Sequence, residues 1–436
     1  MKKKYVRWTL WTIASPFILF IILCILIYLP PIQNFLVDKA AVYASEATGM
    51  NISVGRISLS FPLNLVVTDV DAASPHNDTL LSVRRLQVNV QLLPLLKKQV
   101  EVDGISLQGA TVNSNDLIHG MKLNGTLGEL FISSHGVALD PETAIVNKVL
   151  LKDTDLSLCL NDTAAADTAA SDTTYWKIIL QDIDLQNVSF ALDMPLDSLS
   201  LAASLDNATL RDGLIDLHKS AYSLQTFRIE NGRVRYDNGK PLAADSLSSG
   251  LDPSHIALTD IGVKLDSLYY GGRNMKAIIS QFVLKERSGV EIVSATGRMV
   301  SNDKVLRVPS LKLETRDSYL ELNAAMDWNA LDFKGEGLMS ARLMADIGKP
   351  DVVRFMGSMD EKFIRKYPSE PLRIRTGIDG DLNKLKLTTL TAELPGALGL
   401  FARGELTHLT DSLLRGGDIT LEAETKDLKF VSTLAE

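Results

Sequence analysis

Six histidines are the residues of this sequence best suited to bind a metal ion or to act as a general base. They are far apart, and no two have the i, i+4 spacing of a helical zinc site, so the sequence predicts lone surface histidines and no metal centre. They are His76, His119, His135, His218, His255 and His408.

Two glycine-containing stretches come close to known ligand-binding loops. Residues 120–126 have the glycine spacing of a P-loop, but no lysine follows Gly125. Residues 379–383 resemble the start of a calcium loop, but Lys384 occupies the required glycine position and Leu390 stands where the bidentate glutamate belongs. Both stretches are therefore predicted to be turns. Since there is no Gly-x-Ser-x-Gly elbow either, the sequence predicts no catalytic residues, no cofactor and a protein that is not an enzyme.

The elements that would have to position any site are mostly β-strands. Apolar and polar residues alternate in seven segments, which is typical of strands with one apolar and one wet face in an antiparallel sheet. The segments are 86–92, 156–160, 311–314, 320–324, 372–375, 385–388 and 419–424.

Dipeptides typical of tight hairpin turns occur throughout the same region. With the alternation, they predict a long antiparallel meander with few helices, and not the strand–helix alternation of a parallel α/β enzyme. An apolar rhythm broken by Asp or Asn also recurs, with loose spacing, at 149–156, 180–188, 205–210 and 227–234. The dipeptides are Asp103-Gly104, Asn124-Gly125, Asp212-Gly213, Asn231-Gly232, Asn238-Gly239 and Asp379-Gly380.

Two segments have helical periodicity. One is 33–48, within the region 30–49, which ends at Gly49 and would follow the membrane anchor predicted below. The other is 351–367, whose broad apolar stripe would pack on a sheet or cap an open sheet end. The polar tract 161–174 is predicted to be a flexible loop. Strand patterns on both sides of that loop favour one extended sheet system over two independent domains.

An uncharged stretch at residues 8–29 predicts a membrane anchor. A helix of 22 residues measures roughly 33 Å, enough for a hydrocarbon core of about 30 Å. The basic tail 1–7 places the N-terminus in the cytoplasm and residues 50–436 across the membrane. Residues 30–32 do not resemble a signal-peptide cleavage site, so the anchor is expected to stay uncleaved. Its membrane-contacting residues are expected to be Trp8, Trp11, Phe17, Ile21, Leu26 and Leu29.

The charge of the chain argues against nucleic acid as a partner. The formal net charge is -8, and without the four basic residues of the tail 41 basic residues face 53 acidic ones. A body of net charge -12 lacks the broad cationic field that sequence-independent nucleic-acid binding requires.

A sheet with one apolar face must close on itself, pack on a second sheet or offer that face to a ligand. Alternation alone does not separate these three arrangements. In the third, leucine, valine and isoleucine side chains would line a groove that shields lipid acyl chains from water. The candidate lining residues are Leu86, Val88, Val90, Leu92, Leu156, Leu158, Leu311, Leu313, Leu320, Leu322, Leu385, Leu387, Ile419 and Leu421.

The N-terminal part of the chain resembles the AsmA-like family. The order of anchor, short helix and the stretch 47–70, reading ATGMNISVGRISLSFPLNLVVTDV, is typical of that family, and 80–96 resembles its TamB branch. The resemblance covers about the first 115 residues. TamB relatives are usually much longer and end in a characteristic β-rich domain. The sequence ends at residues 432–436 without such a domain, so we expect either a fragment or a shorter AsmA-type member.

This resemblance implies a single-pass protein of the inner membrane of a diderm bacterium. Its periplasmic part is expected to be an elongated antiparallel β-groove that binds or conducts phospholipid toward the outer membrane. The alternative is a factor that assembles outer-membrane or secreted proteins by strand pairing, together with an outer-membrane barrel partner. The expected partners are therefore phospholipid, the inner membrane and a barrel protein.

Overall fold

The computed structural model describes residues 39–432 except for 40, 44, 47, 61–62, 75–77, 92–101, 115–119, 139–141, 162–174, 240–249, 332–336 and 357–360. The expected anchor 8–29, residues 162–174 of the expected loop 161–174, and Leu92 lie outside the described residues. In the segment 30–49 the described residues from 39 to 48 are all helical, and Gly49 follows with a φ of +70°. Among the described residues, no helix is both long and apolar enough to cross a membrane.

The chain divides into two compact units, residues 1–167 and 168–436, with the boundary in the polar tract 161–174. The described residues form twenty strands and only a few short helices. All observed strand pairs are antiparallel, which confirms a mostly β, antiparallel fold.

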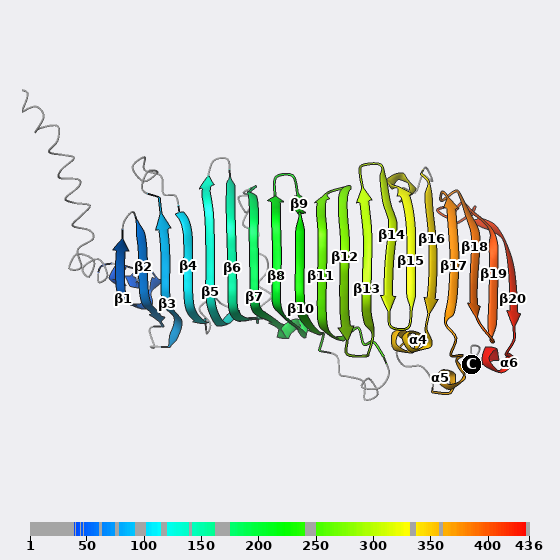
Figure 1. The fold of residues 1–436 in the computed structure, drawn as a ribbon, viewed down its shortest axis with the longest axis horizontal. Helices are drawn as coiled ribbons and strands as arrows, with labels where there is room; N and C mark the ends of the chain where they lie inside the picture. The colour runs from blue at the N-terminus through cyan, green and yellow to red at the C-terminus, as the bar shows by residue number, and fades with distance from the viewer. Residues whose placement is uncertain are drawn as a thin grey trace, which may run out of the picture. The chain divides into compact units, whose positions relative to one another are not determined.

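The first unit is a meander of six strands, each paired with the next in sequence. Figure 1 shows them in order from β1 to β6. They are β1 (Asn51–Ser60), β2 (Asn64–Ala73), β3 (Thr79–Val90), β4 (Val102–Asn113), β5 (Met121–Ala138) and β6 (Thr143–Leu160).

The second unit continues in the same style with fourteen strands, and the short β9 pairs with both β8 and β11. The strands are β7 (Lys177–Met194), β8 (Leu199–Asp216), β9 (Ala221–Leu224), β10 (Thr226–Asp237), β11 (His255–Gly271), β12 (Asn274–Glu286), β13 (Glu291–Ser301), β14 (Val305–Thr315), β15 (Tyr319–Asp327), β16 (Met339–Ile347), β17 (Leu372–Gly380), β18 (Lys384–Leu394), β19 (Leu398–Thr407) and β20 (Gly416–Thr425).

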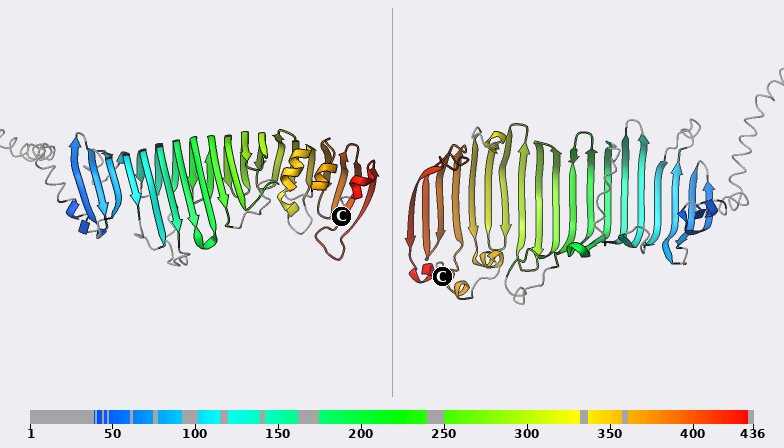
Figure 2. Two further views of the ribbon diagram at one scale, coloured as in Figure 1. Left: turned by 90° about the horizontal axis from the view of Figure 1, so that it is seen from below. Right: turned by 180° about the vertical axis from the view of Figure 1, so that it is seen from behind.

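Helices are short and lie at strand ends. The predicted helix 351–367 is instead described as two helices, α4 (Lys349–Met356) and α5 (Glu361–Lys366). Together with α6 (Leu428–Ser432) they gather at one end of the strands from β14 onward (Figures 1 and 2). Two 3-10 turns, η1 (Pro195–Asp197) and η2 (Trp328–Leu331), follow β7 and β15.

These helices belong to one small apolar cluster. Tyr367, Leu394, Ala397 and Phe430 form its buried centre, and Val352 of α4 and Phe363 of α5 pack against it from the helices. Apart from this cluster, the buried apolar residues of the described chain are scattered, and more than half of them are alanines. The helices therefore cap strand ends, and they do not form a layer over a sheet face.

Four of the six expected hairpin dipeptides lie inside strands. Asn124-Gly125 is in β5 and Asn231-Gly232 is in β10, and Asp103-Gly104 and Asp212-Gly213 also fall within strands. Asn231 and Asp212 have φ near +50° within continuous strands, and Asn231 lies at a bulge in the pairing of β10 with β11. The prediction of turns there was wrong, whereas Asp379-Gly380 does begin the β17–β18 turn.

The most buried charged side chain of the described residues is Asp351 in α4, which is fully inaccessible to solvent. Its Oδ2 accepts hydrogen bonds from the hydroxyls of Thr315 and Ser318, and its Oδ1 lies 3.1 Å from Arg354 Nη1. Since Thr315 and Ser318 flank the β14–β15 turn, this carboxylate fastens α4 to that turn.

We expect Asp351→Ala to lower the free energy of unfolding by about 2 kcal/mol, because two part-buried hydroxyls lose their acceptor. Thermal unfolding of the full chain measures this change. Asp317→Ala is the control: Asp317 also pairs with Arg354, at 3.0 Å, but it is 32% exposed, so a change below about 0.5 kcal/mol is expected. Equal effects of the two substitutions would contradict the role of Asp351.

His255 is not the surface histidine that the sequence predicts, since it is only 6% exposed. Its Nδ1 lies 2.8 Å from Asp252 Oδ2 and its Nε2 lies 3.6 Å from Asp237 Oδ1. The bond with His255 is the main cause that lowers the pKa of Asp252 below the ordinary 3.8, and the backbone N–H of Ser254 adds to it. The nearby Arg287 favours the same ionised state.

The lowered pKa of Asp252 predicts a local dependence on pH. A carboxylate whose pKa is lower in the folded state stabilises the fold above its unfolded value of 3.8, and that stability is lost as the pH falls through the folded value. We expect the protection of the β10 and β11 amides, relative to intrinsic exchange at the same pH, to fall as the pH drops below 3.8. In Asp252→Asn this fall should be absent, and an unchanged pH profile in that variant would refute the assignment.

Candidate functional site

The apolar residues of the first unit line up in rows that run across the strands. Residues directly opposite each other in an antiparallel pair share one face of the sheet, so each row lies on a single face. One row is Ile57, Val67, Leu86, Leu107, Leu130 and Leu151. The next is Leu59, Leu65, Val88, Ile105, Ile132 and Val149.

A second kind of row crosses the middle of the same six strands. Asp69, Gly109 and Asp153 have φ of +53°, +63° and +48°, so each is left-handed inside its strand. By register their positions fall opposite Gly55, Arg84 and Gly128. A Cβ on Gly128 would lie 2.8 Å from the Cβ of Asp153, so glycine is needed for this close approach. We call this row the crease.

At the crease the apolar residues of a strand change from odd-numbered to even-numbered positions, or the reverse. In β3 the apolar residue on one side of the crease is Val83 and on the other side Leu86, and in β2 the corresponding residues are Val70 and Val67. A left-handed residue interrupts the two-residue period of a strand, so the side chains beyond it point to the opposite face from the one that simple alternation would give. The change between odd-numbered and even-numbered apolar positions therefore keeps the apolar side chains on one face on both sides of the crease. Beyond it, another row reads Val54, Val70, Val83, Ala110, Leu127 and Thr154.

The second unit contains a longer row of the same kind. Thirteen residues are paired one after another across β7, β8 and β10–β20, and only one of them, Thr376, is polar. They are Ile183, Leu210, Phe227, Leu265, Ile279, Gly297, Leu311, Leu322, Leu343, Thr376, Leu390, Ala402 and Leu421. We call the faces that carry these rows the apolar faces of the two units.

The opposite faces are charged. In the first unit the row next to the crease reads Arg56, Thr68, Arg85, Gln108, Glu129 and Lys152. In the second unit ion pairs cross neighbouring strands, with Arg375 2.8 Å from Asp346 and Lys384 3.0 Å from Glu405. Arg211 of β8 contacts Asp184 of β7 at 2.6 Å. Each unit is therefore apolar on one face and solvated on the other.

The large side chains of the apolar rows are not fully buried. Neighbours in the row shield them from the sides, but all of them except Val83 keep partial exposure, and Leu421 of β20 is 62% exposed. Strands that are not neighbours make no extensive contact among the described residues, so no second sheet lies over these rows. Among the described residues, the apolar faces thus stay partly exposed to solvent.

The structure brings many of the predicted lining residues together. Leu311 is directly opposite Leu322, and Leu313 is directly opposite Leu320. The remaining predicted residues of the second unit, Leu385, Leu387, Ile419 and Leu421, lie on the same face. In the first unit Leu86 and Val88 belong to the two rows given above, while Val90 pairs with Val102, Leu156 with Gly125 and Leu158 with Leu123.

Sequence reasoning missed other members of the rows. Leu107, Leu130 and Leu151 stand in a row with Leu86, but their strands carry bulges that break the simple alternation. Phe227 and Leu265 were missed for the same reason. The recurring Asp-or-Asn rhythm was the available signal, because Asp153, Asn187 and Asn231 are its left-handed residues.

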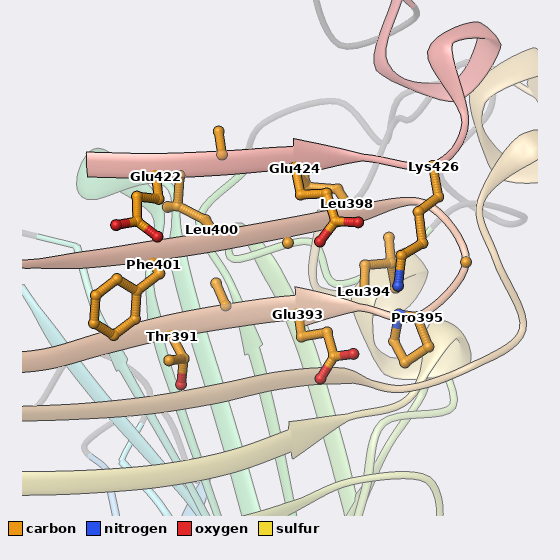
Figure 3. Close-up of a pocket in the computed structure, with 14 residues that line it drawn as sticks. Thr391, Glu393, Leu394, Pro395, Leu398, Leu400, Phe401, Glu422, Glu424 and Lys426 are labelled. Atoms are coloured by element: carbon orange, nitrogen blue, oxygen red, sulfur yellow. The ribbon is translucent and has the colours of Figure 1, made fainter.

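A separate depression lies on the charged face at the ends of β18–β20 (Figure 3). Its lining includes the carboxylates of Glu393, Glu422 and Glu424, with Lys426 beside them. The described part of the chain contains no group of three or more histidine, cysteine or acidic side chains that could hold a metal ion. Searches against protein-family models and curated proteins find no match to this chain.

Proposed function

We propose that the protein binds phospholipid, with the acyl chains lying on the apolar faces, and conducts it between two membranes. The observation that carries this proposal is the uncovered row of thirteen residues in the second unit. An apolar face of this size exposed to water would promote aggregation of a soluble protein, whereas a lipid acyl chain could cover it with hydrocarbon.

The dimensions and energies of the faces agree with this ligand. At about 4.8 Å between strands, six strands span about 24 Å, more than the roughly 15 Å of one bilayer leaflet. Thirteen strands span about 58 Å before twist shortens the distance. Each methylene moved from water to the face contributes about 0.8 kcal/mol. The charged face stays in water while the ligand is held.

The cellular setting is part of the proposal. Residues 8–29 would anchor the chain in the inner membrane of a diderm bacterium, and both units would lie in the periplasm. The resemblance of residues 47–96 to AsmA-like proteins and the uncharged anchor sequence support this placement. Phospholipid homeostasis of the outer membrane would then be the process that the protein serves.

Site-specific photocrosslinking in cells tests the proposal. A crosslinker at Val88, Leu313 or Leu322 is expected to capture phospholipid, which mass spectrometry of the purified adducts identifies. Matched positions on the opposite face of the same strands are Gln87, Lys312 and Glu321, and there we expect at most background capture. Equal capture on both faces, or none on the apolar face of folded protein, would falsify the proposal.

A second candidate function is assembly of outer-membrane or secreted proteins by strand pairing. The edge strand β20 favours it, because all ten of its residues are exposed and β19 is its only partner among the described strands. An incoming strand could pair with its free edge. Crosslinkers at Thr420 would then yield adducts with barrel proteins, and adducts with lipid alone would exclude this function for β20.

A further inference from the structure

Exposed aromatic side chains gather at one end of the strands in the second unit. Tyr222, Tyr269 and Tyr270 are 41%, 40% and 47% exposed, which is more than most large apolar residues of the strands. The rings of Tyr222 and Tyr270 stack at 6.2 Å, and Tyr175 meets His218 edge-on at 5.7 Å. The cluster surrounds β9, at the upper strand ends in Figure 1.

Three cations surround the tyrosines. Lys219 lies in the β8–β9 turn, Arg273 in the β11–β12 turn, and Lys276 is directly opposite Tyr269. All three are exposed, and none forms an ion pair within the described part of the chain. The Arg273 guanidinium lies over the Trp328 ring at 5.7 Å. A cationic group of this kind is unexpected in a body of net charge -12. Lys276 and Tyr269 face the other side of the sheet from their strand neighbours Met275 and Tyr270. We call Lys219, Arg273, Tyr222 and Tyr270 the rim.

The rim borders the apolar face. Tyr270 is directly opposite both Tyr222 and Met275. In β12, Met275 and Ile279 have the same parity, and Ile279 belongs to the row of thirteen residues. Two of the tyrosines therefore stand at the end of the apolar face, where the cations of the adjoining turns meet water.

We propose that the rim binds the phosphate headgroups of the lipids whose acyl chains lie on the apolar face. The inference rests on the proposed function and adds where the headgroup is held. Tyrosine is enriched where hydrocarbon meets water, because its ring is apolar and its hydroxyl is polar. Lys219 and Arg273, in the turns at the end of this face, supply the positive charge that a phosphate requires.

A protein partner is the competing occupant, since tyrosine and arginine are also common in protein interfaces. The position of the rim favours lipid. It is continuous with a long apolar face that needs a hydrophobic ligand, and its cations are not matched by acidic side chains of its own. A phospholipid has both parts in one molecule, with the anionic group at the end of the apolar chains.

Retention of labelled lipids by the full chain, purified in non-ionic detergent, tests the inference. The probes are phosphatidylglycerol and diacylglycerol with the same fluorescent acyl chain, so that only the first carries a phosphate. The rim variant is Lys219→Gln/Arg273→Gln. The control variant Arg228→Gln/Arg235→Gln removes the same charge at exposed positions that lie outside the rim.

We expect the rim variant to retain roughly tenfold less phosphatidylglycerol than the control variant, with unchanged retention of diacylglycerol. Equal retention of phosphatidylglycerol by both variants overturns the headgroup site. So does loss of a co-purifying protein in place of lipid, which would make the rim a protein interface. If the unsubstituted chain retains neither probe, the proposed function itself fails, and this outcome is distinct from failure of the rim alone.

Discussion

Leu343→Arg is expected to reduce phospholipid retention about tenfold or more while leaving the fold stable. Leu343 stands in the long row between Leu322 and Thr376. An acyl chain bound there would have to cover a charged group, and moving a charge out of water costs well over the 1.4 kcal/mol that a tenfold change represents. Without lipid the arginine would remain hydrated, so the free energy of unfolding should change by less than about 0.5 kcal/mol.

Met344→Arg is the matched control for this substitution. Met344 is the next residue of β16, it is 43% exposed, and it lies on the charged face opposite Glu321 and Arg375. We expect its lipid retention to equal that of the unsubstituted chain. A large loss of stability in Leu343→Arg would show instead that the apolar face is a closed core, and the lipid-binding proposal would then be abandoned.

Gly128→Ala is expected to destabilise the first unit by about 3 kcal/mol, because the new methyl group cannot be placed without moving the backbone. A Cβ at Gly128 would lie 2.8 Å from the Cβ of Asp153, 2.9 Å from its carbonyl oxygen and 3.0 Å from that of Lys152. Two of these atoms are main chain, so a rotamer change does not relieve the contact. Thermal unfolding and amide exchange of β5 and β6 measure the effect.

Gly399→Ala controls for the general cost of replacing a strand glycine. A Cβ on Gly399 in β19 would meet no atom within 4 Å, so a change below about 0.5 kcal/mol is expected. If Gly128→Ala were equally mild, the strands at the crease would be able to separate, and the crease would not fix the arrangement of the apolar rows.

The strands themselves were predictable from the sequence because their chemistry is local. In 86–90, for example, side chains alternate between water and the apolar face, and the period of two is visible without knowing any partner strand. Leu311 and Leu313 could be assigned to one face for the same reason, and their strand is β14. The absence of a strand–helix alternation was equally visible.

The bulges could not be predicted in the same way. Asn-Gly and Asp-Gly favour left-handed backbone, and both hairpin turns and bulges need it. The difference lies in whether the chain continues straight, as it does through Asn231-Gly232, and the neighbouring strands decide this. The apolar stripe of the predicted helix 351–367 is shared by α4 and α5, whose residues Val352 and Phe363 pack on the same cluster.

The rows depend on register, which the sequence does not contain explicitly. Phe227 and Leu210 become neighbours only through the register in which β10 pairs with β8. The rim arises in the same way, from β9 placing Tyr222 against Tyr270. Long-range pairing thus determines the candidate site, while local pattern determines only the elements that build it.

Because each strand is held mainly by the strands on either side of it, the two units are modular in the manner of repeat proteins. Insertion or loss of a complete hairpin would leave the remaining pairs intact and would extend or shorten the hydrophobic rows by two places. Evolution could therefore change the length of the apolar faces without redesigning a core.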